Sequence, residues 1–340
     1  MVTIRDVAKK AGVSIGVVSK AFNNYPDVSE KTRKRIFDIA RELNYSPNLV
    51  ARNLSSKRQM TIGMITSGFF NSEGKDNSNS FDLFKGVYTA AEQIQYELAI
   101  FLTDSLKQKQ KSYAQFCRER NIGGAVLQGI RIDDPYFREL LDTNIPCVLV
   151  DVITDNENDL IGNVSTNNIE ASREITSHLL ECNHREIVII AGKKEAFVNT
   201  ERIAGVQLAF KTYGLELHEE DILHAHFSEE EAYEVTKKYL GEKQPTAFLC
   251  FSDLMALGVM KAVKEAGLNI PENISVIGFD GLPISEYTLP PLTTVRQDFF
   301  EIGKQSALML HQLMENKSGE KSKYVRHKLI VRDSVKILPK

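Results

Sequence analysis

Beyond residue 60 the chain alternates short apolar runs with amphipathic segments, and this alternation limits the possible fold more than any other feature. The apolar runs predict strands at Thr61–Thr66, Glu97–Leu102, Gly123–Gln128, Cys147–Asp151, Glu186–Ala191, Ile222–Phe227, Ala247–Phe251 and Ser275–Phe279. Helical spacing of apolar residues predicts helices between them, for example at Phe84–Gln95, Ile169–Cys182, Arg202–Tyr213, Ala232–Leu240 and Asp253–Ala266. Such an alternation is typical of parallel sheets covered by helices on both faces. The predicted strands are too numerous to fit well in a single sheet, so we expect two lobes with a cleft between them.

The first 46 residues lack this strand pattern and predict short helices instead. Thr3 followed by Asp6 is a capping box that begins a first helix, and Gly12 ends that helix. Ser14 caps a second helix. The residues that this second helix is expected to bury are Val17, Val18 and Ala21.

A third helix is expected after Ser29, which again has the side chain of a helix cap. Its apolar face is formed by Ile36, Ile39, Ala40 and Leu43, and its exposed face by Lys31, Arg33, Lys34 and Arg35. Ala8, Gly12 and Val18 supply the small residue, the turn glycine and the β-branched core residue of a helix-turn-helix.

Charge divides the chain at the same place as the helix and strand patterns. Residues 1–58 hold 12 Lys or Arg against 5 Asp or Glu, a balance of +7, whereas the remaining residues carry −10. A generic helical bundle with a solvated basic face is one interpretation. A basic helix-turn-helix module on an acidic body favours the other, which is binding to the phosphates of DNA.

A short segment joins the two parts. Pro47 ends the third helix region, and the run Ala51-Arg52-Asn53-Leu54 has helical character but is too short to be stable alone in water. We therefore expect it to order only against a partner. Leu54 is either a buried linker contact or an apolar wedge between base pairs.

The helix-turn-helix of residues 3–23, the Tyr45-Ser46-Pro47-Asn48 joint and the Ala51-Arg52-x-Leu54 run together closely resemble the LacI/GalR family of bacterial transcription regulators. The resemblance implies a homodimer on a pseudo-palindromic operator, with recognition helices in the major groove and paired hinge helices in the minor groove. It also implies a core of the periplasmic-binding-protein type I fold. The expected domains are the DNA-binding head 1–46, the hinge 47–59, an N-lobe of 60–162 with 291–322, and a C-lobe of 163–290 with 323–340.

The resemblance assigns DNA-contacting roles by position in this sequence. Ile15, Gly16 and Lys20 occupy the base-reading positions, and of these only Lys20 can donate hydrogen bonds to guanine. Phosphate contacts are expected from Thr3, Ser14, Asn23 and Thr32. Leu54 matches the hinge wedge, with Ala51 facing its twin in the partner.

Polar residues at the ends of the predicted strands are the candidates for an effector site, because ligands bind there in such folds. They are Asp151, Asn167, Arg202, Ser252, Asp253 and Asp280. Carboxylates and an arginine suit the hydroxyl groups of a sugar. Arg202 and Asp280 also match effector positions of the family, and Asp253 is either a ligand contact or only a helix cap.

One segment departs from the family pattern. Where many relatives carry aromatic residues after the first strand, this chain has a longer polar stretch that places Asn79 and Ser80 at those positions. Phe81 substitutes if the register slips by one residue. Phe197 and Phe227 are further stacking candidates, with core packing as the alternative for both.

Several classes are excluded or disfavoured. No apolar run approaches the about 20 residues of a membrane span, and no secretion signal is apparent, so a cytoplasmic protein with reduced thiols is expected. No motif supplies a catalytic nucleophile, a metal site or a nucleotide site, so we expect neither an enzyme nor a cofactor. A sugar-binding module without DNA function would not need the basic head.

The sequence thus predicts a homodimeric repressor of carbohydrate-utilisation genes, controlled by a sugar or sugar phosphate between the lobes. The alternative that stays open is a global catabolite-type regulator controlled by a phosphorylated protein partner.

Overall fold

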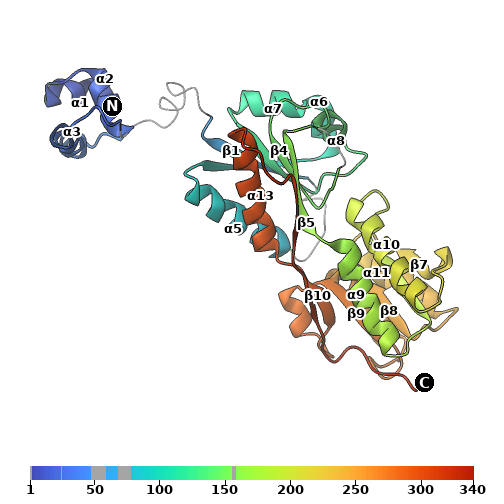
Figure 1. Ribbon diagram of the computed structural model, residues 1–340. Helices are drawn as coiled ribbons and strands as arrows, with labels where there is room; N and C mark the ends of the chain where they lie inside the picture. Colours follow the sequence, from blue (N-terminus) through green and yellow to red (C-terminus); the bar gives the residue numbers. More distant parts are fainter. Residues whose placement is uncertain (1, 24, 47–58, 68–77, 155–157) are drawn as a thin grey trace. The chain divides into compact units, whose positions relative to one another are not determined.

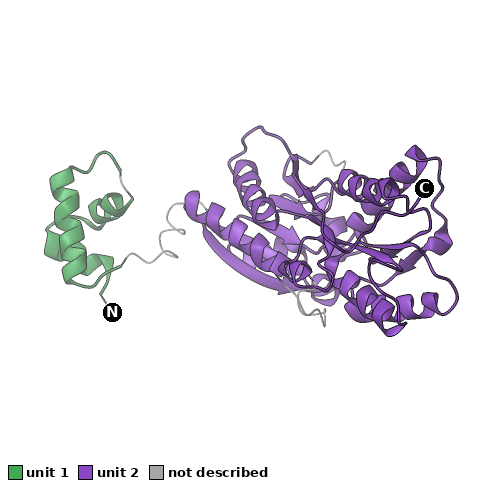
Figure 2. Cartoon of the chain, turned by 90° about the horizontal axis from the view of Figure 1, so that it is seen from below, with its two compact units in different colours: residues 1–59 green, residues 60–340 purple. Residues whose placement is uncertain are grey.

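The computed structural model describes residues 2–23, 25–46, 59–67, 78–154 and 158–340. The chain forms two compact units, residues 1–59 and 60–340 (Figure 2). Most of the predicted hinge, including Ala51 and Leu54, lies outside the described residues.

The first unit contains the three predicted helices, α1 (Ile4–Ala11), α2 (Ile15–Phe22) and α3 (Glu30–Glu42). The Asp6 carboxylate accepts hydrogen bonds from the Thr3 backbone amide and hydroxyl, at 2.8 and 2.7 Å. Gly12 ends α1 with a φ of 63°, a conformation that costs glycine least. The Ser14 and Ser29 hydroxyls cap α2 and α3, as expected.

The core of this unit consists of small and β-branched side chains from all three helices. The buried residues are Val7, Ala8, Ala11, Val18, Ala21, Val28, Ile36 and Ala40. Val17, Ile39 and Leu43 pack against this cluster but remain partly exposed. The predicted apolar faces are therefore correct, with their outer edges open to solvent.

The second unit contains two six-stranded sheets (Figure 1). The first sheet is parallel throughout and has the order β11-β5-β4-β3-β1-β2. Its strands are β1 (Thr61–Ser67), β2 (Glu97–Thr103), β3 (Gly124–Gln128), β4 (Cys147–Val150), β5 (Ile161–Thr166) and β11 (Ser322–Val325). The second sheet has the order β12-β10-β9-β8-β6-β7, and its pairings are parallel except for β12 against β10. Its strands are β6 (Ile187–Ala191), β7 (Ile222–His224), β8 (Ala247–Cys250), β9 (Ser275–Asp280), β10 (Thr293–Arg296) and β12 (Lys328–Ile330).

Helices cover both sheets. Around the first sheet they are α5 (Ser78–Gln93), α6 (Ser105–Gln110), α7 (Tyr113–Glu119), α8 (Pro135–Leu140) and α13 (Phe299–Met314). Around the second sheet they are α9 (Asn168–Glu181), α10 (Phe197–Thr212), α11 (Glu229–Leu240) and α12 (Asp253–Glu265), with 3-10 turns at Glu219–Asp221 and Pro283–Glu286. Helices α5 and α13 lie side by side (Figure 1). Gly86 and Gly303 permit this contact, because a Cβ at either position would come within about 2 Å of a carbonyl oxygen of the other helix.

The chain crosses between the sheets three times, and each crossing comes later than the predicted positions 162, 290 and 322. Strand β5 stays in the first sheet through Thr166, β10 pairs in the second sheet through Arg296, and β11 pairs in the first sheet through Val325. These strands are short and partly polar, so apolar periodicity did not reveal them. We call residues 60–166 and 297–325 lobe 1, and residues 167–296 and 326–340 lobe 2.

Within the described residues, no helix combines the length and the apolar character that crossing a membrane requires. The four cysteines are buried free thiols, and burial raises the pKa of Cys117 to about 11.

Candidate functional site

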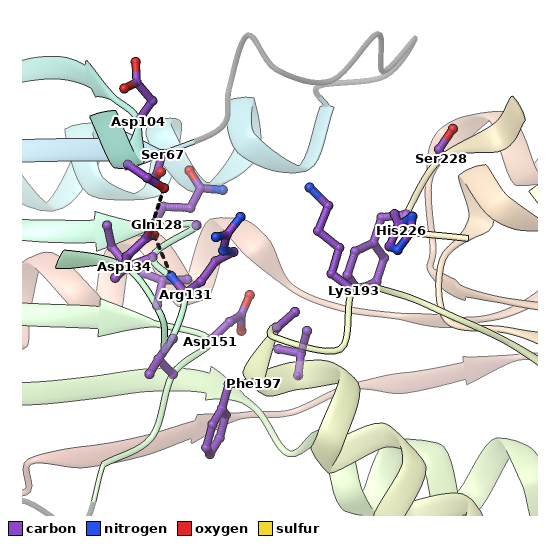
Figure 3. Close-up of a pocket in the computed structure, with 18 of the residues that line it drawn as sticks. Ser67, Asp104, Gln128, Arg131, Asp134, Asp151, Lys193, Phe197, His226 and Ser228 are labelled. Atoms are coloured by element: carbon purple, nitrogen blue, oxygen red, sulfur yellow. Dashed lines mark hydrogen bonds between the residues drawn. The ribbon is translucent and has the colours of Figure 1, made fainter. Parts of the chain in front are cut away.

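A cavity of about 570 Å³ lies where segments that follow the strands of both lobes meet (Figure 3). Lobe 1 contributes Ser67, Asp104, Gln128, Arg131 and Asp151, among others. Lobe 2 contributes Lys193, Phe197, His226, Phe227 and Ser228, among others. The site is therefore at the carboxyl ends of parallel strands, as the strand pattern predicted.

Asp151 is the predicted effector residue whose carboxylate faces the cavity most directly (Figure 3). It follows β4 with a φ of 60°, an unusual conformation for a residue with a side chain. The Ser165 hydroxyl donates a 2.8 Å hydrogen bond to this carboxylate. Burial raises the pKa of Asp151, while the Ser165 hydrogen bond and the Arg202 charge oppose that rise.

Phe197, the other predicted effector residue in the cavity wall, also joins the lobes. It begins α10 in lobe 2, yet it packs against the apolar cluster of lobe 1 that includes Leu149 and Val152. The alternative of core packing thus describes part of its role. It therefore contacts lobe 1 from the first residue of a lobe 2 helix, at the edge of the cavity.

Arg202 is not part of the cavity lining, and only 4% of the residue is exposed. Its Nε donates to Asn168 Oδ1 at 2.9 Å and its Nη1 donates to the Phe251 carbonyl. Nη2 lies 3.9 Å from Asp280 Oδ1, and the guanidinium lies 3.8 Å from the centre of the Phe279 ring. The surrounding carboxylates favour its charge, although burial lowers the pKa of Arg202.

Asn168 connects Arg202 to the cavity. It is fully buried at the first residue of α9, directly after the first crossing between the lobes. Its amide nitrogen donates to Ser165 Oγ at 3.3 Å and to Glu201 Oε2 at 3.1 Å, while its oxygen accepts from Arg202. A continuous polar chain therefore leads from Asp151 in lobe 1 through Ser165 and Asn168 to Arg202 in lobe 2. Burial raises the pKa of Glu201, on the side of this chain, to about 7.

The remaining candidates in lobe 2 have partners inside that lobe. Ser252 caps α12 by accepting from the Met255 amide, and Asn167 caps α9 by accepting from the Glu170 amide. Asp253 is fully buried and is not the cap. Its two carboxylate oxygens accept from the Thr294 hydroxyl at 2.5 Å and from the Leu282 amide at 2.7 Å.

Asp280 differs, because its carboxylate accepts a 2.7 Å hydrogen bond from Nε2 of Gln297, a residue of lobe 1, while Arg202 of lobe 2 lies nearby. Asp253, Asp280, Ser252 and Asn167 are not part of the cavity lining. Each of these four side chains has a hydrogen-bond partner within the protein.

The three candidates at the start of α5 differ from one another. Ser80 Oγ accepts a 3.2 Å hydrogen bond from Gln128, which lines the cavity. Phe81 is 59% exposed and packs near Phe84, with the Lys85 ammonium over its ring. None of the three is part of the cavity wall, although Ser80 contacts it through Gln128.

The sequence interpretation missed Gln128, Arg131, Lys193 and His226 as lining residues. Each follows or ends a strand that had been placed nearly correctly, so the rule that ligands bind at strand ends, applied to every strand, finds them. Lys193 extends its ammonium into the space between the lobes (Figure 3). Arg131 is held by both oxygens of Asp133, at 2.8 and 2.6 Å.

Strand β7 ends earlier than predicted because His226 and Phe227 both have positive φ, at 49° and 62°. Two consecutive side-chain-bearing residues in this region store strain, which is characteristic of functional sites. Phe227 packs directly over Gly192, where a Cβ would lie 2.0 Å from the ring. His226 Nδ1 lies 2.5 Å from Glu231 Oε2.

The predicted DNA-contacting residues of the head lie at helix ends and on α2. Ile15 is 44% exposed at the start of α2, next to Gly16, and the Lys20 side chain is about half exposed one turn further on. Asn23 ends α2 and donates to the Ser19 carbonyl. Thr3 and Ser14 are caps, and the Thr32 hydroxyl accepts from Ser29.

A helix-turn-helix head joined to a two-lobed, periplasmic-binding-protein-like core defines a class of DNA-binding transcription regulators. Residues 3–48 match the model of bacterial regulatory proteins of the lacI family, and residues 176–335 match the periplasmic binding protein-like domain. The chain belongs to the LacI family.

Relatives of known role cover almost the whole chain. The HTH-type transcriptional repressor PurR of Vibrio vulnificus (strain CMCP6) is 34% identical over 99% of this chain and 99% of its own length. The repressor of the same name from Vibrio cholerae serotype O1 (strain M66-2) is 33% identical over 100% of both.

Among solved structures, the lac repressor dimer bound to operator and the anti-inducer ONPF has a TM-score of 0.85. It is 27% identical and covers 98% of this chain and 99% of its own. The CelR–cellobiose complex, with a TM-score of 0.74 and 24% identity over 98% of this chain and 100% of its own, shares the fold. These likenesses confirm the predicted fold class. They also identify a DNA-binding transcription regulator and not an enzyme.

Proposed function

We propose that the protein is a homodimeric repressor of carbohydrate-utilisation genes that binds a pseudo-palindromic operator and responds to a sugar or sugar phosphate in the cavity between its lobes. Residues 1–46 read the operator, and residues 47–59 act as a hinge that orders on DNA. Residues 60–340 sense the effector and hold the dimer together.

The reading surface is the exposed side of α2. Lys20 donates to guanine O6 and N7 in the major groove, and Ile15 contacts a thymine methyl group or packs against the backbone. Gly16 contributes no side chain and lets α2 approach the bases closely. Thr3, Ser14, Asn23 and Thr32 lie at helix ends, from which phosphate contacts fix the register without reading sequence.

The polar lining of the cavity carries the proposal of a sugar. Carboxylate, amide, hydroxyl and ammonium groups enter the same space from both lobes, and they match the alternating donors and acceptors of a polyhydroxylated ring. Phe227 offers an apolar surface for one face of that ring. Lys193 is placed to meet a phosphate or carboxylate substituent, because its ammonium enters the cavity from lobe 2.

The first crossing of the chain between the lobes provides a route by which the effector influences the head. A ligand on Asp151 in lobe 1 and Lys193 in lobe 2 favours one angle between the lobes, and the Asp151–Ser165–Asn168–Arg202 chain spans the joint where that angle changes. Arg202 and Asp280 thus act on the effector through positioning rather than through the cavity wall. In the dimer, the lobe angle sets whether the two hinge segments can pair on DNA.

The lac repressor structure supports this architecture, since that protein is a dimer bound at once to operator and to a small-molecule anti-inducer. The PurR relatives are transcriptional repressors over the same length, which supports repression as the outcome.

A ligand panel tests the effector class. Thermal unfolding of the full chain would be measured with monosaccharides, disaccharides, sugar phosphates and nucleobases. An effector at a free concentration of about 100 times its Kd raises the unfolding free energy of the chain by about 2.7 kcal/mol. Asp151→Asn should lose this stabilisation, whereas Asp142→Asn, an exposed acid of the same lobe, should retain it.

Stabilisation by a sugar or sugar phosphate that requires Asp151 supports the proposal. Stabilisation by nucleobases alone, or by no compound of the panel, contradicts the sugar assignment and leaves the assignment of the DNA-reading head untouched.

A further inference from the structure

The Lys20 ammonium on α2 forms an ion pair and hydrogen bond with the Asp27 carboxylate. Asp27 lies in the loop between α2 and α3, and both side chains are about half exposed. The Asp27 interaction raises the pKa of Lys20, and Lys20 lowers the pKa of Asp27, so both groups stay charged around neutrality.

The loop that carries Asp27 is held in place from α3. Arg33 Nη2 donates to the Tyr25 carbonyl at 2.8 Å and to the Val28 carbonyl at 3.3 Å, on either side of Asp27. Val28 is buried in the head core, with 7% of its surface exposed. The carboxylate therefore stands on an anchored loop, while the lysine side chain is the flexible partner.

Asp27 differs from the other described acids of the head. Asp6 caps α1, Asp38 lies near Arg41 on α3, and Glu42 pairs with Lys10 of α1. Among the ion pairs within the described residues of the head, Asp27 is the acid whose partner is a side chain of α2.

We propose that Asp27 is a specificity-determining residue of the operator-reading surface, which holds the Lys20 ammonium in position for a guanine and keeps it off the phosphates. The inference rests on the proposed role of Lys20 as a base reader. It adds a second residue, outside α2, to the reading of the same base pair.

Three physical arguments support the proposal. A lysine ammonium has three donors on a flexible stem, so one can remain on Asp27 while the other two face guanine O6 and N7. A lysine without such an anchor is free to bind any nearby phosphate, which adds affinity but no sequence information. The Asp27 charge also repels phosphates at every sequence, which lowers the sequence-independent part of the affinity and leaves the guanine contact a larger share of it.

The other two base-reading positions make discrimination between operator sequences depend more strongly on the Lys20–Asp27 pair. Gly16 has no side chain and Ile15 has no hydrogen-bond donor, so Lys20 provides the hydrogen bonds to base edges from these three positions. Loss of its fixed position should therefore weaken discrimination more than affinity.

The test measures discrimination by the full-length protein. Operator sequences would first be selected from random duplexes, and Kd would then be measured by fluorescence anisotropy for the selected operator and for each single base-pair substitution at one salt concentration. Lys20→Ala identifies the G·C pair that Lys20 reads, as the position where substitution no longer weakens binding.

Asp27→Asn should reduce discrimination at this same base pair about tenfold, mainly through tighter binding to the substituted operators. Asp38→Asn makes the same change of net charge on α3 without touching Lys20, and it should leave the discrimination ratio unchanged. Asp27→Glu, which restores the carboxylate, should restore at least part of the ratio and also serves if the asparagine variant folds poorly.

Discrimination that is lost in Lys20→Ala but unchanged in Asp27→Asn would overturn the inference and leave the proposed function standing. Equal loss in Asp27→Asn and Asp38→Asn would also overturn it, since net charge alone would then be the cause. If Lys20→Ala changes discrimination nowhere, the proposed role of Lys20 fails and this inference fails with it.

Discussion

Replacing Arg202 by alanine tests whether the buried network around it holds lobe 2 together. The substitution removes the donors to Asn168 Oδ1 and the Phe251 carbonyl, and it removes a cation 3.9 Å from Asp280. It also takes the guanidinium from above the Phe279 ring.

The expected cost follows from what is left behind. Breaking a buried ion pair costs about 3–5 kcal/mol, because the remaining charge stays buried without its partner. Whole domains are stable by only about 5–15 kcal/mol, so Arg202→Ala should remove a large part of the stability of the core. Arg202→Lys keeps a charge but cannot reproduce the planar fork, and an intermediate loss of about 1–3 kcal/mol is expected.

Urea unfolding of the full chain, followed by circular dichroism at 222 nm, measures these losses. Arg173→Ala is the matched control, because Arg173 pairs with Glu170 on the surface of α9 and its loss should cost less than about 1 kcal/mol. At low urea concentration, Arg202→Ala should bind operator but fail to respond to effector. A loss of stability no larger than that of Arg173→Ala would refute the structural role assigned to this network.

Three further predictions concern other parts of the chain. Gly12→Ala should lower the unfolding free energy of the head by about 1–2 kcal/mol, because Gly12 has a φ of 63°. Gly16→Ala, inside α2 with space for a Cβ, should raise that free energy by about 0.5–1 kcal/mol. Thermal unfolding of both variants measures the two changes, and changes of the same sign would contradict this reasoning. Burial raises the pKa of Glu201, so its contribution to stability is complete below about pH 4.5 and is lost as the pH rises to about 7. Glu201→Gln should therefore match the wild-type chain at pH 4.5 and exceed its unfolding free energy by about 3 kcal/mol at pH 8 in urea titrations, and a difference independent of pH would be inconsistent with this origin. Leu54→Ala should weaken operator binding while leaving effector binding intact, and equal loss of both in parallel titrations would show that the two roles are not separate.

The periodic parts of the fold were predictable from the sequence. The head helices and their caps depend on local signals at Thr3, Gly12, Ser14 and Ser29, and the structure confirms them. The central strands of both sheets were predictable because a strand buried on both faces is apolar throughout.

The short strands next to the lobe crossings could not be found in this way. Strand β5 reads Ile-Gly-Asn-Val-Ser-Thr and β10 reads Thr-Thr-Val-Arg, so their strand character comes from pairing with distant neighbours rather than from local pattern. The lobe crossings follow these strands, and their positions were consequently placed too early.

The site was predictable in its place but not in its orientation. A strand end near the cleft identifies Asp151 and Asp253 equally well, yet one carboxylate faces the cavity and the other is turned inward to Thr294 and Leu282. That choice depends on the loop after β9 and on β10, which are distant in sequence. The anchoring of Lys20 by Asp27 depends likewise on a loop conformation that no local motif encodes.

The central claim is that a ligand in the cavity controls the affinity of the head for DNA. The most direct measurement is the operator Kd of the full-length chain with and without a saturating effector, together with the effector Kd with and without operator. Coupling of about 1–3 kcal/mol predicts that both Kd values change by the same factor, about 5- to 150-fold. Effector binding that leaves the operator Kd unchanged would contradict the account.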